Sequence, residues 1–223
     1  MKIGINLVGV SYNDGTTGRY RNYRDAVDGF FTNVVTPLKE TGNEIIFYLY
    51  TYDSTERNNI LNTYIPVRKS QFVSPVLNHI GGGDRLPNGI KVISNSYINS
   101  LSQLLEEDLD LVISTRYDIN FFKNPFKEYQ YDFTKCNFLW REPEFTHIPI
   151  VNDTFIVFPH KMTQHLINAI VEMELNPPHG VGVAMHNIYV TMVNQVGEDN
   201  VRWVCDDFKT AVENNLYKLM RHD

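Results

Sequence analysis

Apolar and polar positions near the N-terminus follow first a strand-like and then a helix-like pattern. Residues 3–10 are rich in apolar and β-branched side chains, which predicts a central parallel strand. Over residues 23–40 the apolar positions recur at offsets of three and four, as in an amphipathic helix, and Gly42 suits its C-terminal cap. Residues 44–52 predict a second strand. The start of the chain therefore predicts a strand–helix–strand unit, which implies a parallel sheet with right-handed crossovers.

The alternation of strands and helices continues to the C-terminus. Further strands are predicted near residues 71–76, 109–113, 137–140, 155–158 and 201–204. Helices are predicted over residues 94–107, 162–175, 182–196 and 211–221, and residues 54–61 predict a short helix or loop. This alternation predicts an α/β fold with an open, mostly parallel sheet flanked by helices. A length of 223 residues fits a single domain.

Composition narrows the classes of function. A formal charge of -6 and a pI near 5.6 argue against a general nucleic-acid binder, although one or two local cations suffice for a diphosphate. No apolar run approaches the roughly 18 residues of a membrane span, and the N-terminal run is too short and interrupted for a signal peptide. We therefore expect a cytoplasmic protein with no transmembrane segment. Cys136 and Cys205 are expected to be buried, reduced thiols.

The most informative segment is the strand predicted at residues 109–113 and the polar residues that follow it. Arg116, Tyr117, Asp118 and Asn120 come directly after this strand, where open α/β sheets bind ligands. Asp118 and Asn120 offer oxygen ligands separated by one residue, the type that Mg²⁺ or Mn²⁺ prefers. The fork of Arg116 could bind phosphate. The alternative is a surface Arg–Asp pair at a strand end.

The stretch DLDLVISTRYDINF, residues 108–121, resembles the motif region of nucleotide-diphospho-sugar transferases with the GT-A fold. In that family a metal-binding DXD motif follows a buried strand, and many members carry an Arg and a single Asp in a T-R-x-D pattern. The resemblance covers the first half of the chain. It implies a GT-A-like (Rossmann-like) fold, with residues 1–122 as the nucleotide-binding half and residues 123–223 as the sugar and acceptor half.

The resemblance also implies an activity. The expected enzyme transfers a hexosyl or deoxyhexosyl group from a nucleotide-diphospho-sugar, with a UDP-sugar favoured, to a hydroxyl of a carbohydrate or glycan acceptor. A divalent metal, Mn²⁺ or Mg²⁺, would assist at Asp118 and Asn120. Because this sequence has one acid where a strict DXD has two, a further ligand would come from His179 or His186. His179 is preferred, since it precedes the predicted helix.

The loop after the first strand, residues 10–19, contains Gly15 and Gly18, which permit tight turns and close approach of the backbone. It matches neither a Walker A loop nor GxGxxG, and the missing glycine pattern argues against a dehydrogenase. In the resembled family this loop holds the base and ribose, so Tyr12 could stack on a base, and Arg19 or Arg24 could meet phosphate. The residues expected to bind the nucleotide-sugar are Val10, Ser11, Tyr12, Arg19, Asp53, Arg116 and Tyr117. An ordinary loop with solvated arginines, and a turn-forming Asp53, are the alternatives.

Two acids are candidates for the general base. Asp153 directly precedes the apolar strand at residues 155–158, and in an inverting transferase a carboxylate held near the donor sugar deprotonates the acceptor hydroxyl. Glu142, after the preceding strand, is the second candidate. An inverting enzyme is slightly favoured, whereas a retaining enzyme would need no such base. The alternative function is a non-catalytic nucleotide-sugar-binding module of the same fold.

Overall fold

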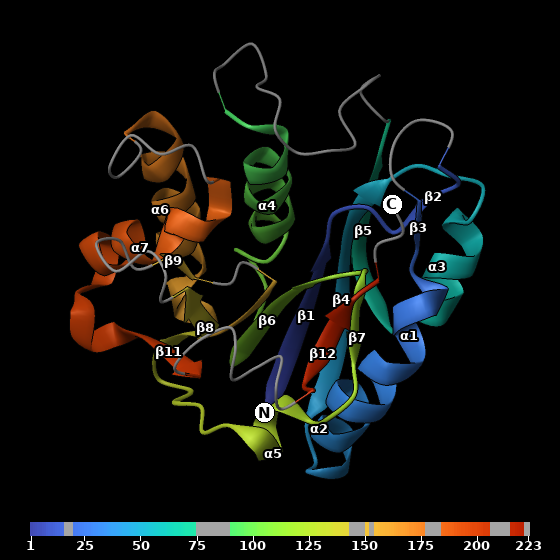
Figure 1. Cartoon of the computed structure of the whole chain (residues 1–223), viewed down its shortest axis with the longest axis horizontal. Helices are drawn as coiled ribbons and strands as arrows, with labels where there is room; N and C mark the ends of the chain where they lie inside the picture. The colour runs from blue at the N-terminus through green and yellow to red at the C-terminus, as the bar shows by residue number, and fades with distance from the viewer. Residues whose placement is uncertain are drawn as a thin grey trace.

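A single large sheet runs through both halves of the chain. The computed structural model describes residues 1–15, 20–74, 90–142, 150–151, 154–176, 184–205 and 215–220. The sheet has eight strands, seven of them in the order β11-β8-β10-β6-β1-β4-β5, and β9 pairs with β8 beside this path (Figure 1). The α/β architecture with a mostly parallel sheet flanked by helices is therefore confirmed.

The N-terminal half supplies the parallel part of the sheet. β1 (Lys2–Val8) lies between β4 (Glu44–Tyr52) and β6 (Leu111–Arg116), and β5 (Val67–Val73) continues the parallel arrangement beyond β4. Residues 3–8 of β1 are buried in succession on both faces. A strand buried on both faces reads as a continuous apolar run, which is why the sequence pattern identified it.

Strands of the C-terminal half extend the same sheet in mixed directions. β10 (Phe155–Pro159) is antiparallel to both β6 and β8 (Cys136–Glu142). β11 (Val201–Cys205) is parallel to β8, and the short β9 (Ile150–Val151) is antiparallel to it. Since β10 runs opposite to its two neighbours, the start of β10 lies at the same edge of the sheet as the ends of β6 and β8.

Helices cover both faces of the sheet. On one face α1 (Arg24–Phe30), η1 (Phe31–Val35) and α2 (Thr36–Glu40) form the continuous helical run predicted over residues 23–40, with a π-helical middle. Gly42 follows it with φ +81°, as a helix terminus favours. On the other face lie α4 (Val92–Ser102), α6 (Thr163–Leu175) and α7 (Ile188–Val196) (Figure 1).

Shorter elements connect these layers. They are β2 (Tyr12–Asn13), β3 (Arg21–Asn22), α3 (Arg57–Thr63), β7 (Ile119–Phe121), α5 (Pro125–Glu128), η2 (His160–Met162), η4 (Ala184–Asn187), η5 (Glu198–Asn200) and β12 (Tyr217–Leu219). Within the part of the chain that the structure describes, no helix is both long and apolar enough to span a membrane.

The prediction of a C-terminal helix over residues 211–221 is wrong for residues 217–219. Residues 217–219 form β12, which pairs antiparallel with β7, so that Tyr217 lies opposite Phe121 and Leu219 opposite Ile119. The neighbouring Leu216 is completely buried, and the Tyr217 hydroxyl accepts a hydrogen bond from Trp140 Nε1 at 2.7 Å. The apolar spacing fits a helix, but pairing with a distant strand determined the conformation. Residues 206–214 lie outside the described residues.

Candidate functional site

The candidate site lies at the edge of the sheet where the parallel strands end. Arg116, the last residue of β6, is paired with Val8 at the end of β1, and Val8 is paired with Tyr50 near the end of β4. The segments that follow these three strands therefore leave the sheet at one edge. Ligands of open α/β sheets bind in this position.

Two arginines share one carboxylate at this edge. Arg116 donates from Nε and Nη2 to the two oxygens of Asp118, at 2.9 and 2.7 Å. Arg21 Nε lies 3.6 Å from Oδ2 of the same carboxylate. Asp118 is 4% exposed, and the side chains of Arg116 and Arg21 are 18% and 10% exposed. We call these residues the Arg21–Arg116–Asp118 cluster; it combines two cations with one anion in a largely buried place.

Three segments of the chain bring the cluster together. β6 delivers Arg116, and the turn that follows brings Asp118 back onto its guanidinium group. The backbone carbonyl of Asp118 accepts a hydrogen bond from the Met220 amide at 2.8 Å, next to β12. Arg21 comes from β3, which pairs with β2 in the segment after β1. The cluster therefore depends on three segments that are far apart in the sequence.

Tyr117 points into the core. It is 2% exposed and packs edge-on against Tyr64, with ring centroids 5.7 Å apart. Among the residues that the structure describes, none bonds to its hydroxyl, and burial raises the pKa of this hydroxyl well above its ordinary value. In this conformation the side chain anchors the turn before Asp118 and does not face the edge of the sheet.

The segment after β1 is held by hydrogen bonds to β4. The Ser11 amide donates to Thr51 Oγ1 at 3.1 Å, and the Thr51 hydroxyl donates to Ser11 Oγ at 2.7 Å. Because Ser11 is 1% exposed, its side chain fixes the loop. Val10 and Tyr12 on either side are partly exposed.

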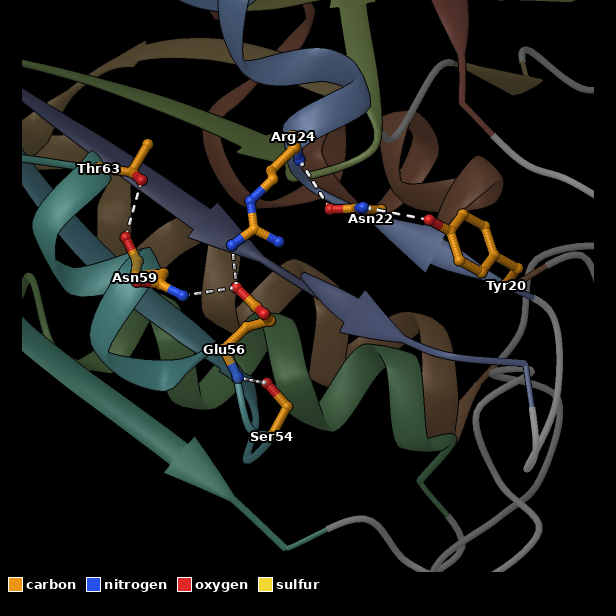
Figure 2. Close-up of polar contacts among 7 residues, drawn as sticks. All are labelled: Tyr20, Asn22, Arg24, Ser54, Glu56, Asn59 and Thr63. Atoms are coloured by element: carbon orange, nitrogen blue, oxygen red, sulfur yellow. Dashed lines mark hydrogen bonds and ion pairs between the residues drawn. The ribbon is translucent and has the colours of Figure 1, made fainter.

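A second polar network joins the segments after β1 and β4 (Figure 2). Arg24 at the start of α1 forms an ion pair with Glu56, which also accepts a hydrogen bond from Asn59 Nδ2 at 3.0 Å. The Asn59 hydrogen bond, followed by the one from Arg24, lowers the pKa of Glu56. Asn22 accepts from the Arg24 amide and donates to the Tyr20 hydroxyl, each at 3.1 Å.

Asp53 follows β4 at the same edge. Its amide donates to the Val73 carbonyl at 2.8 Å, and its carboxylate lies 3.8 Å from Arg57 Nη1. Both side chains of this ion pair are about half exposed, so the pair contributes little to stability. Asp53 is accessible beside the loop that holds Tyr12.

The remaining sequence candidates lie only partly within the described structure. Arg19, Asp153 and His179 lie outside the described residues, as do the side chains of Glu142 and His186. The backbone of Glu142 ends β8. Thr154, directly before β10, is described: its carbonyl accepts a hydrogen bond from Thr115 Oγ1 at 2.9 Å.

The described side chains do not fit a divalent cation at Asp118. Both oxygens of this carboxylate accept hydrogen bonds from Arg116, and a second guanidinium lies close by. The Asn120 carboxamide packs against α1: a Cβ atom added at Gly29 would overlap its Oδ1. Among the residues that are described, no three His, Cys, Asp or Glu residues gather closely enough to hold a metal ion.

Arg21 is the site residue that sequence reasoning missed. Arg19, Arg21 and Arg24 all lie in or near the loop after the first strand, and no local pattern distinguishes them. Only the pairing of β2 with β3 directs Arg21 toward Asp118. Arg24, named as an alternative phosphate ligand, instead pairs with Glu56.

No protein-family model matches the chain, and no curated protein sequence is similar to it. Among solved structures, it is similar to a crystal structure of an active-site mutant of LgtC, a glycosyltransferase. The TM-score is 0.47 and the identity 12%, over 91% of this chain and 72% of that chain. At this TM-score and identity the likeness is loose.

Proposed function

We propose that this protein is a glycosyltransferase that takes a sugar from a nucleotide-diphospho-sugar, with a UDP-sugar favoured, and transfers it to a hydroxyl of a carbohydrate or glycan acceptor. The observation that carries the proposal is the Arg21–Arg116–Asp118 cluster at the ligand-binding edge of an α/β sheet. The leaving group of such a donor is a nucleoside diphosphate. Cationic groups that are already positioned where negative charge develops on the leaving group are a major source of transition-state stabilisation.

The neighbouring segments provide the other parts of such a site. Tyr12 is partly exposed after β1 and would stack on the base, and Asp53 after β4 would contact the nucleoside. Val10 and Ser11 would shape this loop, with Ser11 acting through its bond to Thr51. These contacts would hold the donor with its diphosphate toward Arg116.

The acceptor side would be supplied by β8 and β10. Thr154 is bonded to Thr115, one residue before Arg116, and β8 ends at this same edge of the sheet. Asp153, adjacent to Thr154 in the sequence, is the proposed general base of an inverting reaction, and Glu142 at the end of β8 is the second candidate. Either would accept the proton of the attacking hydroxyl.

A panel of nucleotide-sugars tests the proposal. Melting temperature is measured with UDP-, GDP-, ADP- and dTDP-sugars, each with EDTA and with Mn²⁺, because a ligand that binds only the folded state stabilises it. We expect one nucleotide class to raise the melting temperature. No stabilisation by any donor in either condition would contradict the proposal.

Turnover distinguishes an enzyme from a binding module. The stabilising donor is incubated with the protein and a mixture of simple glycans, and release of free nucleoside diphosphate is measured. Release above the protein-free rate supports the transferase. Stabilisation without release, with every acceptor offered, would instead support a non-catalytic nucleotide-sugar-binding module.

A further inference from the structure

We infer that the Arg21–Arg116–Asp118 cluster binds the diphosphate of the donor directly, with Asp118 acting as the partner of the two guanidinium groups and not as a metal ligand. The inference rests on the proposed function and specifies how its diphosphate is recognised. It differs from the sequence-based prediction of a Mn²⁺ or Mg²⁺ ion at Asp118, Asn120 and His179.

The Asp118 carboxylate is already paired with a guanidinium group. A cation-binding aspartate must present at least one oxygen to the ion, but both oxygens of Asp118 accept charge-assisted hydrogen bonds from Arg116. A divalent ion would have to share these oxygens with the Arg116 fork, with Arg21 and Arg116 nearby as like charges. Repulsion between these cations opposes binding of the ion, and it is strengthened by the low exposure of the cluster.

The ion pair with Asp118 orients the guanidinium group of Arg116. A planar guanidinium carries five N–H donors on different edges, so a carboxylate on one edge is compatible with a phosphate on another. The Nε and Nη2 contacts to Asp118 hold the plane of Arg116 in one orientation. Such prior orientation reduces the entropy lost when a ligand binds.

The arginines of the cluster are more exposed than its carboxylate. The guanidinium groups of Arg21 and Arg116 stand together beside the Asp118 carboxylate at the ligand-binding edge, within a chain whose overall charge is -6. Both guanidinium side chains keep some exposure, 18% for Arg116 and 10% for Arg21, whereas Asp118 is 4% exposed. The positive groups are thus more accessible to an anion than Asp118 is to a cation.

Calorimetric titration of the full chain with UDP and with inorganic pyrophosphate tests the inference, in EDTA and in Mn²⁺. We expect UDP to bind in EDTA, with an affinity that Mn²⁺ changes by less than about threefold. UDP binding that appears only with Mn²⁺ would overturn the inference and leave the glycosyltransferase proposal standing. Absence of nucleoside diphosphate binding in both conditions would overturn both.

Variants separate a binding role from a purely structural ion pair. Arg116→Gln combined with Asp118→Asn removes both charges and avoids a buried lone carboxylate, so the fold is retained more readily than in the single Arg116 variant. This double variant, and Arg21→Gln, should each bind UDP at least about tenfold more weakly in EDTA. The matched control is Arg68→Gln. Arg68 is an exposed arginine at the start of β5, at the edge of the sheet opposite the cluster, and its replacement should change affinity by less than about twofold. Wild-type affinity in the double variant would overturn the inference.

Asp118→Asn alone distinguishes the two roles of the carboxylate by the sign of its effect. A metal ligand that loses its charge binds the ion and its diphosphate more weakly. A carboxylate that only partners arginines opposes the phosphate, so Asp118→Asn should bind UDP in EDTA at least as tightly as the wild type. Binding weaker by about tenfold or more in a variant with a cooperative melting transition would contradict the assignment.

Discussion

Replacement of Gly29 by alanine tests the packing of α1 on β7, the strand that follows Asp118. A Cβ atom at position 29 would overlap Asn120 Oδ1 and lie 2.5 Å from the Phe121 carbonyl oxygen. That carbonyl also accepts a hydrogen bond from Asn33 Nδ2 at 2.8 Å, so it is held in place. Overpacking costs about 1–3 kcal/mol, with the upper end expected where a backbone atom is involved. Alanine has a higher helix propensity than glycine, which offsets about 1 kcal/mol of this cost, so the free energy of unfolding should fall by about 2 kcal/mol.

Urea denaturation followed by circular dichroism measures this loss. The control is Asp28→Ala, an exposed neighbour on the same helix, for which we expect a change below about 0.5 kcal/mol. Adding Asn120→Ala to Gly29→Ala should recover only part of the loss, because the contact with the Phe121 carbonyl remains. A Gly29→Ala protein as stable as the wild type would refute the close packing of α1 against β7.

Three further predictions concern the side chains of Tyr117, Glu107 and Cys136. Tyr117→Phe removes a buried hydroxyl to which no described residue bonds and should leave stability unchanged or raise it by up to about 1 kcal/mol in urea denaturation; a clear loss would show that the hydroxyl is bonded. The pKa of Glu107 is lowered mainly by its hydrogen bond from Lys69. The charged Glu107 side chain therefore stabilises the fold at pH values above the ordinary carboxyl pKa, and this stabilisation is lost as the pH falls through the lowered pKa. Glu107→Gln should therefore flatten the acid part of a stability–pH profile, and an unchanged slope would count against the pairing. Burial raises the pKa of the completely buried Cys136 thiol, which should resist a thiol reagent until the protein is unfolded; rapid labelling of the native state at this position would contradict its burial.

Much of the sheet and its helices could be predicted because their signals are local. The apolar run of β1 and the helical spacing over residues 23–40 depend on which faces are buried, and burial leaves a periodic pattern in the sequence. The polar residues after β6 were also identifiable, since strand polarity alone places Arg116 and Asp118 at the carboxyl edge.

Other features have no local signal. β12 was predicted as helix because its apolar spacing fits both conformations, and only pairing with β7 decides between them. The inward orientation of Tyr117 likewise depends on Tyr64, a residue from the segment before β5.

The sequence by itself determined that a cation and an acid stand at the end of a buried strand, and it favoured a ligand site there. Only the tertiary structure decided how these charges are paired. Arg21, almost one hundred positions before Asp118 in the chain, joins Arg116 at the same carboxylate because the segment after β1 folds back beside the end of β6. Interactions between distant segments determine whether an aspartate is open to a cation or already paired, and that difference is invisible to any pattern along the chain.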